Sequence, residues 1–252
     1  MAETFEELPM IDKRRILAAG KTIGQFVFQR TAAILVGPPA ATDGVIQNGS
    51  CFILRVHGKA YLGTARHVVR FWMDRRATGE SVVFQIGRAS LEPAHRIVWE
   101  DEQADIAFLR LEEAEVALIG ISTFEPTCGW PPPRPAVGDF VHITGYPAFQ
   151  RRQPGPAAYD FRSLGFRLSV KSIGEHHLAC QFEREYWMVT DGFAIPPVGV
   201  DLGGMSGGPV LLERPLAYPL IGLVAEHTPA YEIMRVSTLG HAPETFEGRD
   251  TV

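Results

Sequence analysis

The sequence has few cysteines and no long apolar run, and both absences exclude classes of protein. Its three cysteines, Cys51, Cys128 and Cys180, fit no zinc spacing and form no C-x-x-C motif, so no metal site or other cofactor is expected. Three is also an odd number, whereas secreted domains usually pair their cysteines. The longest apolar stretch, residues 216–225, contains a proline and is too short to span a bilayer.

A basic segment and a secretory signal are missing as well. The net charge is −5, and Lys/Arg residues cluster no further than pairs such as Arg75 with Arg76, so nucleic-acid binding is not expected. Near the N-terminus, the apolar residues 16–20 are followed at once by Lys21, which interrupts the run that a signal peptide needs. We therefore expect a cytoplasmic protein without a membrane partner.

Glycine and proline are abundant, with 25 and 19 residues, and they separate short β-branched runs. This pattern is typical of an antiparallel β-barrel or sandwich. The segments predicted as strands are residues 51–56, 60–64, 81–86, 106–111 and 140–144. The first two are expected to form a hairpin. The prolines at 131–133 cannot join a sheet because proline lacks the N–H donor, so they are predicted to link two halves of the chain.

The segment GGMSGGPV, residues 203–210, is the first candidate functional site. Ser206 stands among four glycines, which are used where the main chain takes unusual dihedral angles or lies close to a ligand. If Ser206 is a nucleophile, the N–H groups of Gly204 and Ser206 can point together at a developing oxyanion. A phosphate-binding loop is excluded, because no Gly-Lys-Ser/Thr sequence follows and a strand comes next.

A nucleophilic serine needs a base and an acid, and the sequence contains a candidate for each. His67, in TARHVV, directly follows a predicted strand, so a loop is expected to hold it at a barrel edge. Asp105 leads into the strand predicted at 106–111, where burying a carboxylate is costly unless it is hydrogen-bonded. The imidazole of His67 is its expected partner, since a base requires an acid that fixes its tautomer.

In this order, the segments TARHVV, DIAFLRL and GGMSGGPV resemble those of the trypsin-like (chymotrypsin-fold) serine peptidases, and of the bacterial members in particular. The segments VHITGYP and LIGLVA are similar to supporting segments of the same family. The resemblance covers residues 24–238. It implies an all-β fold of two six-stranded antiparallel β-barrels, here with a short N-terminal helix.

On this resemblance the chain divides into five parts: an N-terminal helical segment (1–21), a first β-barrel with the histidine and the aspartate (22–125), a Pro-rich linker (126–138), a second β-barrel with the serine (139–240) and a polar tail (241–252). Within the first part, a short helix is predicted from Asp12 to Ala19, with Gly20 as its stop. Residues 150–158 are expected to form a surface loop, and the tail is expected to be mobile.

The resemblance implies a serine endopeptidase that acts on protein or peptide substrates through an acyl-enzyme. Ser206 is then the nucleophile, His67 the base and Asp105 the residue that orients the base, while the N–H groups of Gly204 and Ser206 form the oxyanion hole. An intracellular regulatory or defence-type protease is expected, together with an activating or restraining protein partner. The alternative is a latent or non-catalytic module that binds a protein through its cleft.

Two places depart from the family pattern. Met205 precedes the serine where the digestive members carry an aspartate that pairs with a new N-terminus, so activation by that ion pair is not expected. The family's substrate pocket corresponds to Val200 and to residues 225–227, which are Ala225, Glu226 and His227. Val200 is apolar and does not indicate an aspartate-lined pocket. Glu226 or His227 either forms a polar wall, favouring an acidic or a basic side chain, or faces solvent.

Overall fold

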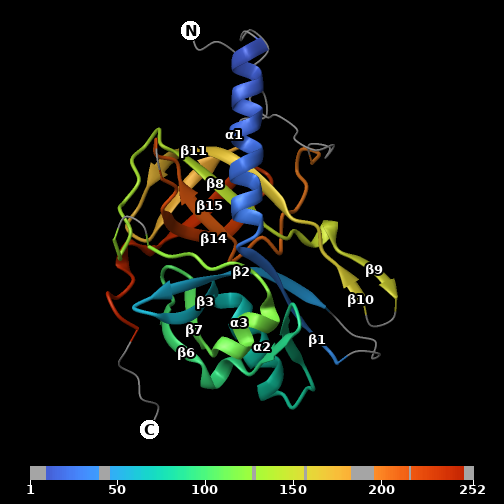
Figure 1. Ribbon diagram of the computed structural model, residues 1–252. Helices are drawn as coiled ribbons and strands as arrows, with labels where there is room; N and C mark the ends of the chain where they lie inside the picture. The colour runs from blue at the N-terminus through green and yellow to red at the C-terminus, as the bar shows by residue number, and fades with distance from the viewer. Residues whose placement is uncertain are drawn as a thin grey trace.

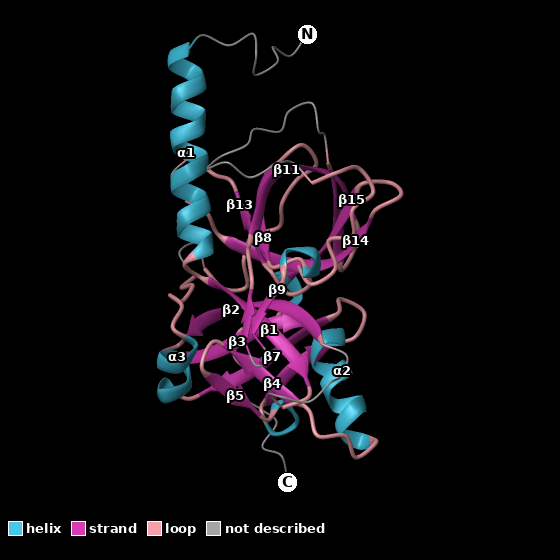
Figure 2. Cartoon of the chain, turned by 90° about the vertical axis from the view of Figure 1, so that its right-hand side faces the viewer, coloured by secondary structure: helices cyan, strands magenta, loops and turns pink. Residues whose placement is uncertain are grey.

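The computed structural model describes residues 10–39, 46–126, 129–155, 158–182, 196–215 and 217–246. Their strands form two bodies, one above the other in Figures 1 and 2, and one helix runs beside them. No hydrogen-bonded ladder between the described strands joins one body to the other. The chain thus consists mostly of strands that form two separate bodies, and this confirms the all-β, chymotrypsin-like architecture expected from the sequence.

The first body is a seven-stranded sheet in the order β5-β4-β1-β2-β3-β7-β6. Its strands are β1 (Thr31–Gly37), β2 (Gln47–Val56), β3 (Lys59–Ala65), β4 (Val83–Ile86), β5 (Ala89–Leu91), β6 (Ile97–Asp101) and β7 (Ile106–Leu111). β2 and β3 form the expected hairpin. His57 and Gly58 both take positive φ angles in its two-residue turn, as a tight hairpin of this kind requires.

This first sheet differs from the expected six-stranded barrel, because it has seven strands and is curled rather than closed. The two edge strands are short: β5 has three residues, and β6 has five with a register shift between Ile97 and Trp99. No ladder joins these two edge strands, so the sheet stays open among the described residues.

The second body is a closed barrel of six strands in the order β11-β12-β15-β14-β13-β8. Its strands are β8 (Phe140–Gly145), β11 (Leu164–Ile173), β12 (His177–Gln181), β13 (Pro209–Leu212), β14 (Leu220–Thr228) and β15 (Ile233–Thr238). Apolar side chains such as Val141, Ile143 and Val236 fill its interior, and Met205 is buried among them. The second half therefore matches the expected six-stranded barrel.

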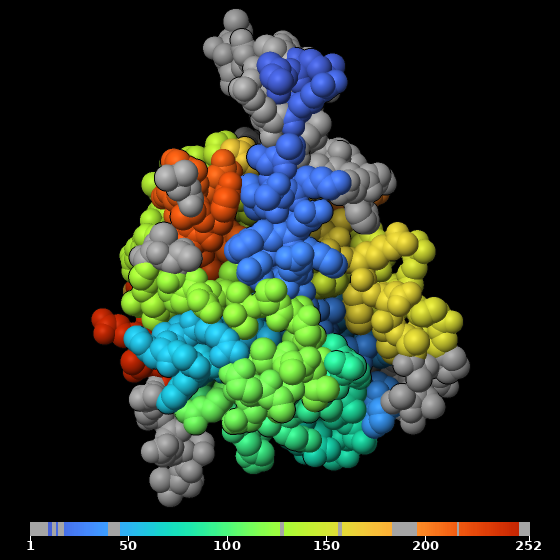
Figure 3. All heavy atoms as spheres, in the orientation of Figure 1, coloured from blue at the N-terminus to red at the C-terminus, as the bar shows by residue number. Residues whose placement is uncertain are grey.

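The N-terminal helix α1 spans Met10–Phe28, well past the stop predicted at Gly20. A glycine inside a helix costs only about 1 kcal/mol, and burial of apolar side chains outweighs that cost. Ile23 and Val27, near the end of the helix, are buried against the core of the first sheet. The opposite end of α1 projects beyond both bodies (Figure 3).

The remaining helices are α2 (Arg66–Ala77) and α3 (Glu113–Ile119), both packed on the first sheet. Where a surface loop was expected at 150–158, the chain forms a small hairpin of β9 (Arg152–Gly155) and β10 (Ala158–Asp160). Most side chains of this hairpin are exposed. Strands are predicted from an alternation of apolar and polar residues, and a segment with no buried face does not show it.

The beginning of the expected polar tail is packed rather than mobile. Phe246 is buried in the core of the first sheet, with its ring 4.7 Å from that of Tyr61 and 4.8 Å from that of Phe108. Residues 247–252 lie outside the described part of the chain, as does Cys128. The packing of Phe246 thus fixes the start of a segment whose polar composition predicted mobility.

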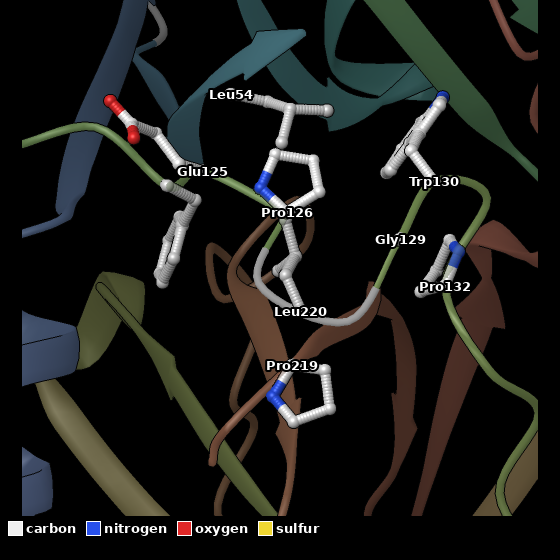
Figure 4. Close-up of a pocket in the computed structure, with 9 residues that line it drawn as sticks. Leu54, Glu125, Pro126, Gly129, Trp130, Pro132, Pro219 and Leu220 are labelled. Carbon is white, nitrogen blue, oxygen red and sulfur yellow. The ribbon is translucent and has the colours of Figure 1, made fainter.

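The described residues at the start of the predicted linker lie at the boundary between the two bodies. Pro126, Trp130 and Pro132 face Leu54 of β2 on one side and Leu220 of β14 on the other, around a small cavity (Figure 4). The indole Nε1 of Trp130 donates a hydrogen bond to the carbonyl of Pro243 at 2.8 Å. This cavity lies apart from the candidate triad residues, none of which lines it.

Candidate active site

Two hydrogen bonds fix His67 to Asp105. The imidazole Nδ1 lies 2.6 Å from the carboxylate Oδ2, and the backbone N–H of His67 donates to Oδ1 at 2.9 Å. The carbonyl of Asp105 in turn accepts the N–H of Arg66 at 3.0 Å. Asp105 adopts a left-handed φ of 55°, a conformation that few residues other than glycine, asparagine and aspartate tolerate. The carboxylate is therefore held in one orientation.

His67 lies in the first turn of α2, not in the loop that was expected. β3 ends at Ala65 and the helix begins at the next residue, with no side chain of Ala65 to cap it. The carboxylate of Asp105 satisfies one free N–H of this helix end and places a negative charge near the positive end of the helix dipole. Val68, Val69 and Trp72 are buried, which fastens the helix to the sheet.

The contact with Asp105 also selects the useful tautomer of His67. A carboxylate accepts hydrogen bonds, so Nδ1 carries the proton and donates it. In the neutral ring Nε2 is then an acceptor, which is the state that a general base requires. The side chain of His67 is 44% exposed and faces the cleft, so Nε2 is accessible to a substrate.

Ser206 lines the same cleft as His67 and Asp105, a hollow of about 280 Å³. Its hydroxyl donates to the carbonyl of Ala225 at 3.1 Å, and no hydrogen bond joins it to His67 within the described part of the chain. A change of one staggered χ1 rotamer moves a serine Oγ to a different side of its Cβ. Catalytic hydrogen bonds are often formed only once substrate is bound.

The backbone around Ser206 leaves two N–H groups without an acceptor among the described residues, those of Gly204 and Ser206. The carbonyls beside them are all bonded: that of Gly203 accepts from Ala148 N at 2.6 Å and that of Met205 from Gly208 N at 2.8 Å. In a trans peptide the N–H points opposite to the C=O. Each free N–H shares a peptide unit with one of these bonded carbonyls, so the direction of each N–H is fixed.

The walls of the cleft contain three of the four expected substrate-binding residues. Ala225, Glu226 and His227 line it, whereas Val200 packs partly buried against the core of the second barrel. Glu226 forms an ion pair with Arg235 at 2.9 Å. The ring of His227 packs edge-on against a neighbouring phenylalanine ring.

Sequence reasoning missed two charged residues of the cleft, Asp201 and Arg235. Asp201 is exposed, and its Oδ1 accepts the N–H of Gly203 at 2.8 Å. It directly follows Val200, the residue that the family spacing indicated. The signal for Arg235 is its pairing with Glu226 across β14 and β15, which a single sequence does not reveal.

The serine loop, the histidine and the aspartate all fall within one recognised domain. Residues 49–214 match the family model of the trypsin-like peptidase domain. The chain belongs to this family. The trypsin-like peptidase domain covers more than half of the sequence, and the protein is accordingly a serine protease of the chymotrypsin fold. No curated protein shows significant similarity to it.

Solved structures similar to this trypsin-like peptidase include a thermostable serine protease, AL20, from an extremophilic microorganism, with 15% identity over 84% of this chain and 91% of the other and a TM-score of 0.47. Another is a protease from M. tuberculosis in its active form, with 17% identity over 83% and 76% and a TM-score of 0.44. A third is the serine protease of a human pathogenic astrovirus, with 15% identity over 83% and 89% and a TM-score of 0.46.

Two further observations concern the described residues alone. No helix among them is long and apolar enough to cross a membrane. Within the same residues, no group of three or more His, Cys, Asp or Glu side chains is arranged to hold a metal ion. The adjacent histidines His176 and His177, at the start of β12, belong to no such group among the described residues, although Nδ1 of His176 lies 4.0 Å from Oδ2 of Asp101.

Proposed function

We propose that this protein is a serine endopeptidase in which Ser206 is the nucleophile, His67 the general base and Asp105 the residue that orients it. The double hydrogen bond from His67 to Asp105, beside Ser206 in one cleft, is the observation that carries the proposal. A histidine with a purely structural role would not need one aspartate, held at a left-handed φ, to fix both its backbone N–H and its ring.

The reaction begins when the Ser206 hydroxyl turns from the carbonyl of Ala225 to Nε2 of His67. Its oxygen attacks the substrate carbonyl carbon while the proton passes to Nε2, and the carbonyl π electrons move to the oxygen. The N–H groups of Gly204 and Ser206 donate to this oxyanion. On collapse, the C–N bond breaks and His67 protonates the leaving amine, which leaves an acyl-enzyme. Water, deprotonated by His67, then releases the acid product and restores Ser206.

The cleft is suited to a basic substrate side chain. Glu226 is already paired with Arg235, so these two charges largely compensate each other. Asp201 has no cationic partner among the described residues, and it lines the same cleft as Gly203 and Ser206. A lysine or arginine of the substrate supplies the missing charge and a charge-assisted hydrogen bond.

The chemistry of the cysteines supports an intracellular site of action. Cys51 and Cys180 are both free thiols, and both are buried. Burial raises the pKa of Cys180 to about 12 and the pKa of Cys51 even further, so neither forms a reactive thiolate near neutral pH. Unpaired thiols fit a reducing compartment, in which a regulatory or defence-type protease would need a restraining or activating protein partner.

A latent or non-catalytic module that binds a protein through its cleft is the second candidate. The hydroxyl of Ser206, bonded to Ala225 and not to His67, is the observation that favours it. A latent enzyme of this kind would need a partner to turn the serine toward its base.

A fluorophosphonate probe separates the two candidates, because it reacts with a serine only when its base is in place. We would treat the purified protein, Ser206→Ala and His67→Ala with the probe and locate the adduct by peptide mass spectrometry. Modification of Ser206 that disappears in both variants supports the endopeptidase. An unreactive but folded wild type, judged by circular dichroism, contradicts it and favours the binding module.

A further inference from the structure

Ser50 of the first sheet contacts both ends of the loop that carries the free N–H groups. It lies in β2 and is completely buried. Its hydroxyl donates to the carbonyl of Gly204 at 2.8 Å and accepts the N–H of Tyr146 at 2.8 Å. Its backbone N–H donates to the carbonyl of Ser206, also at 2.8 Å. One residue thus bonds the carbonyls of Gly204 and Ser206, which belong to the peptide units on either side of the one that carries the Ser206 N–H.

The N–H of Ala148 holds the peptide unit before Gly204 through the carbonyl of Gly203, and Ser50 holds the peptide unit after it. Gly204 has a φ of 97°, and a glycine lets its two peptide units rotate against each other at low cost unless both are held. The side chain of Met205 is buried in the second barrel and makes no ion pair. The orientation of the loop therefore depends on hydrogen bonds to neighbouring backbone and to Ser50.

A second residue of β2 braces the same region from the same face of the strand. Residues 48 and 50 are two apart, so both side chains point toward the boundary between the bodies. The Asn48 amide donates to the carbonyl of Tyr146 at 2.7 Å and accepts from Arg151 at 3.1 Å. It thereby positions the chain that leads to Ala148, whose N–H holds the carbonyl of Gly203.

We infer that Ser50 is a positioning residue that keeps the Gly204 N–H aimed at the oxyanion, from the opposite body of the molecule. This inference rests on the proposed function, because an oxyanion hole matters only in an enzyme that forms an oxyanion.

The test is Ser50→Ala, assayed as kcat and KM on a peptide substrate, with active sites counted by the end point of fluorophosphonate labelling. Loss of an oxyanion donor typically lowers kcat by about 100- to 1,000-fold. A misoriented Gly204 N–H is expected to cause a smaller decrease in kcat. We expect kcat per active site to fall by roughly 10- to 100-fold while KM stays within about threefold. The inhibition constant of a peptide aldehyde, whose adduct places an oxygen in the hole, is expected to rise by a similar factor.

Two further variants separate positioning from stability. Thr31→Val removes another buried hydroxyl, at the start of β1, which donates to the carbonyl of Val27 in α1 at 2.8 Å. This variant is expected to lower the melting temperature without changing kcat per active site. Ser50→Cys keeps a weak donor of similar shape, and it is expected to fall between wild type and alanine. If Ser50→Ala does not fold, kcat per active site of Ser50→Cys tests the positioning role of Ser50 instead.

The outcomes are distinct. If the wild type hydrolyses peptides and both Ser50 variants keep its kcat per active site, the proposed role of Ser50 is wrong, whereas the proposed endopeptidase activity is supported. An equal loss in Thr31→Val also overturns that role, since it then reflects stability. If the wild type neither labels nor hydrolyses, the proposed function fails and the role of Ser50 fails with it.

Discussion

Replacing Asp105 by asparagine isolates one property of the site, the tautomer of His67. Asparagine has nearly the same shape and tolerates the φ of 55° at this position. Its amide has one acceptor oxygen, whereas the carboxylate uses two, for the backbone N–H of His67 at 2.9 Å and for Nδ1 at 2.6 Å. The backbone N–H can only donate, so it takes the asparagine oxygen, and the NH2 group faces Nδ1.

An NH2 group in that place makes Nδ1 an acceptor, so the ring proton moves to Nε2 and His67 cannot take the proton of Ser206. We expect Asp105→Asn to lower kcat by roughly 10,000-fold, the usual cost of the wrong tautomer, with little change in KM. Asp101→Asn is the matched control, because Asp101 also accepts a backbone N–H, that of Ala104 at 2.9 Å. Steady-state kinetics on a peptide substrate, with a melting curve for each variant, measure the effect. An Asp105→Asn enzyme that keeps more than about a tenth of the wild-type kcat would refute the reasoning.

Three other predictions concern specificity, pH and the end of the chain. Asp201→Asn is expected to lower kcat/KM by about tenfold for substrates with arginine before the scissile bond and to leave alanine substrates unchanged; equal effects on both would contradict the pairing. Burial lowers the pKa of His142 despite its contact with Glu213, so the unfolded chain binds this proton more readily and the folded state loses stability as the pH falls through about 6.5. Melting temperatures between about pH 7.5 and 5.5 are expected to decline less steeply in His142→Gln, and an unchanged slope would count against this origin. Phe246→Ala is expected to cost about 3–5 kcal/mol in a urea titration, whereas a loss below about 1 kcal/mol would show that the ring is not part of the core.

The sequence predicted those parts of the fold that local chemistry determines. The strand at 106–111 matches β7 residue for residue, because a short run after an aspartate that is apolar apart from Arg110 has few other solutions. The β2–β3 hairpin was predictable from its turn residues. The segments that carry His67, Asp105 and Ser206 were identified together and do line one cleft, although their catalytic roles stay a prediction.

Other features depend on contacts that no local pattern contains. α1 continues through Gly20 because Ile23 and Val27, farther along the chain, are buried against the first sheet. His67 lies on a helix because a carboxylate nearly forty residues later satisfies the helix end. Phe246 packs against strands that begin far earlier in the sequence. In each case the deciding partner is distant in sequence and near in space.

The position of Ser206 and His67 on different halves of the molecule has a consequence for how the enzyme fails. A small shift of one half against the other would break the bond from Ser50 to Ser206 and separate Ser206 from His67, whereas the strand ladders within each half would survive. Activity therefore gauges the docking of the halves more sensitively than secondary structure does. In a denaturant series, hydrolysis is expected to vanish before the far-ultraviolet circular dichroism changes. A ligand that wedges the boundary open would inhibit the enzyme without entering its cleft.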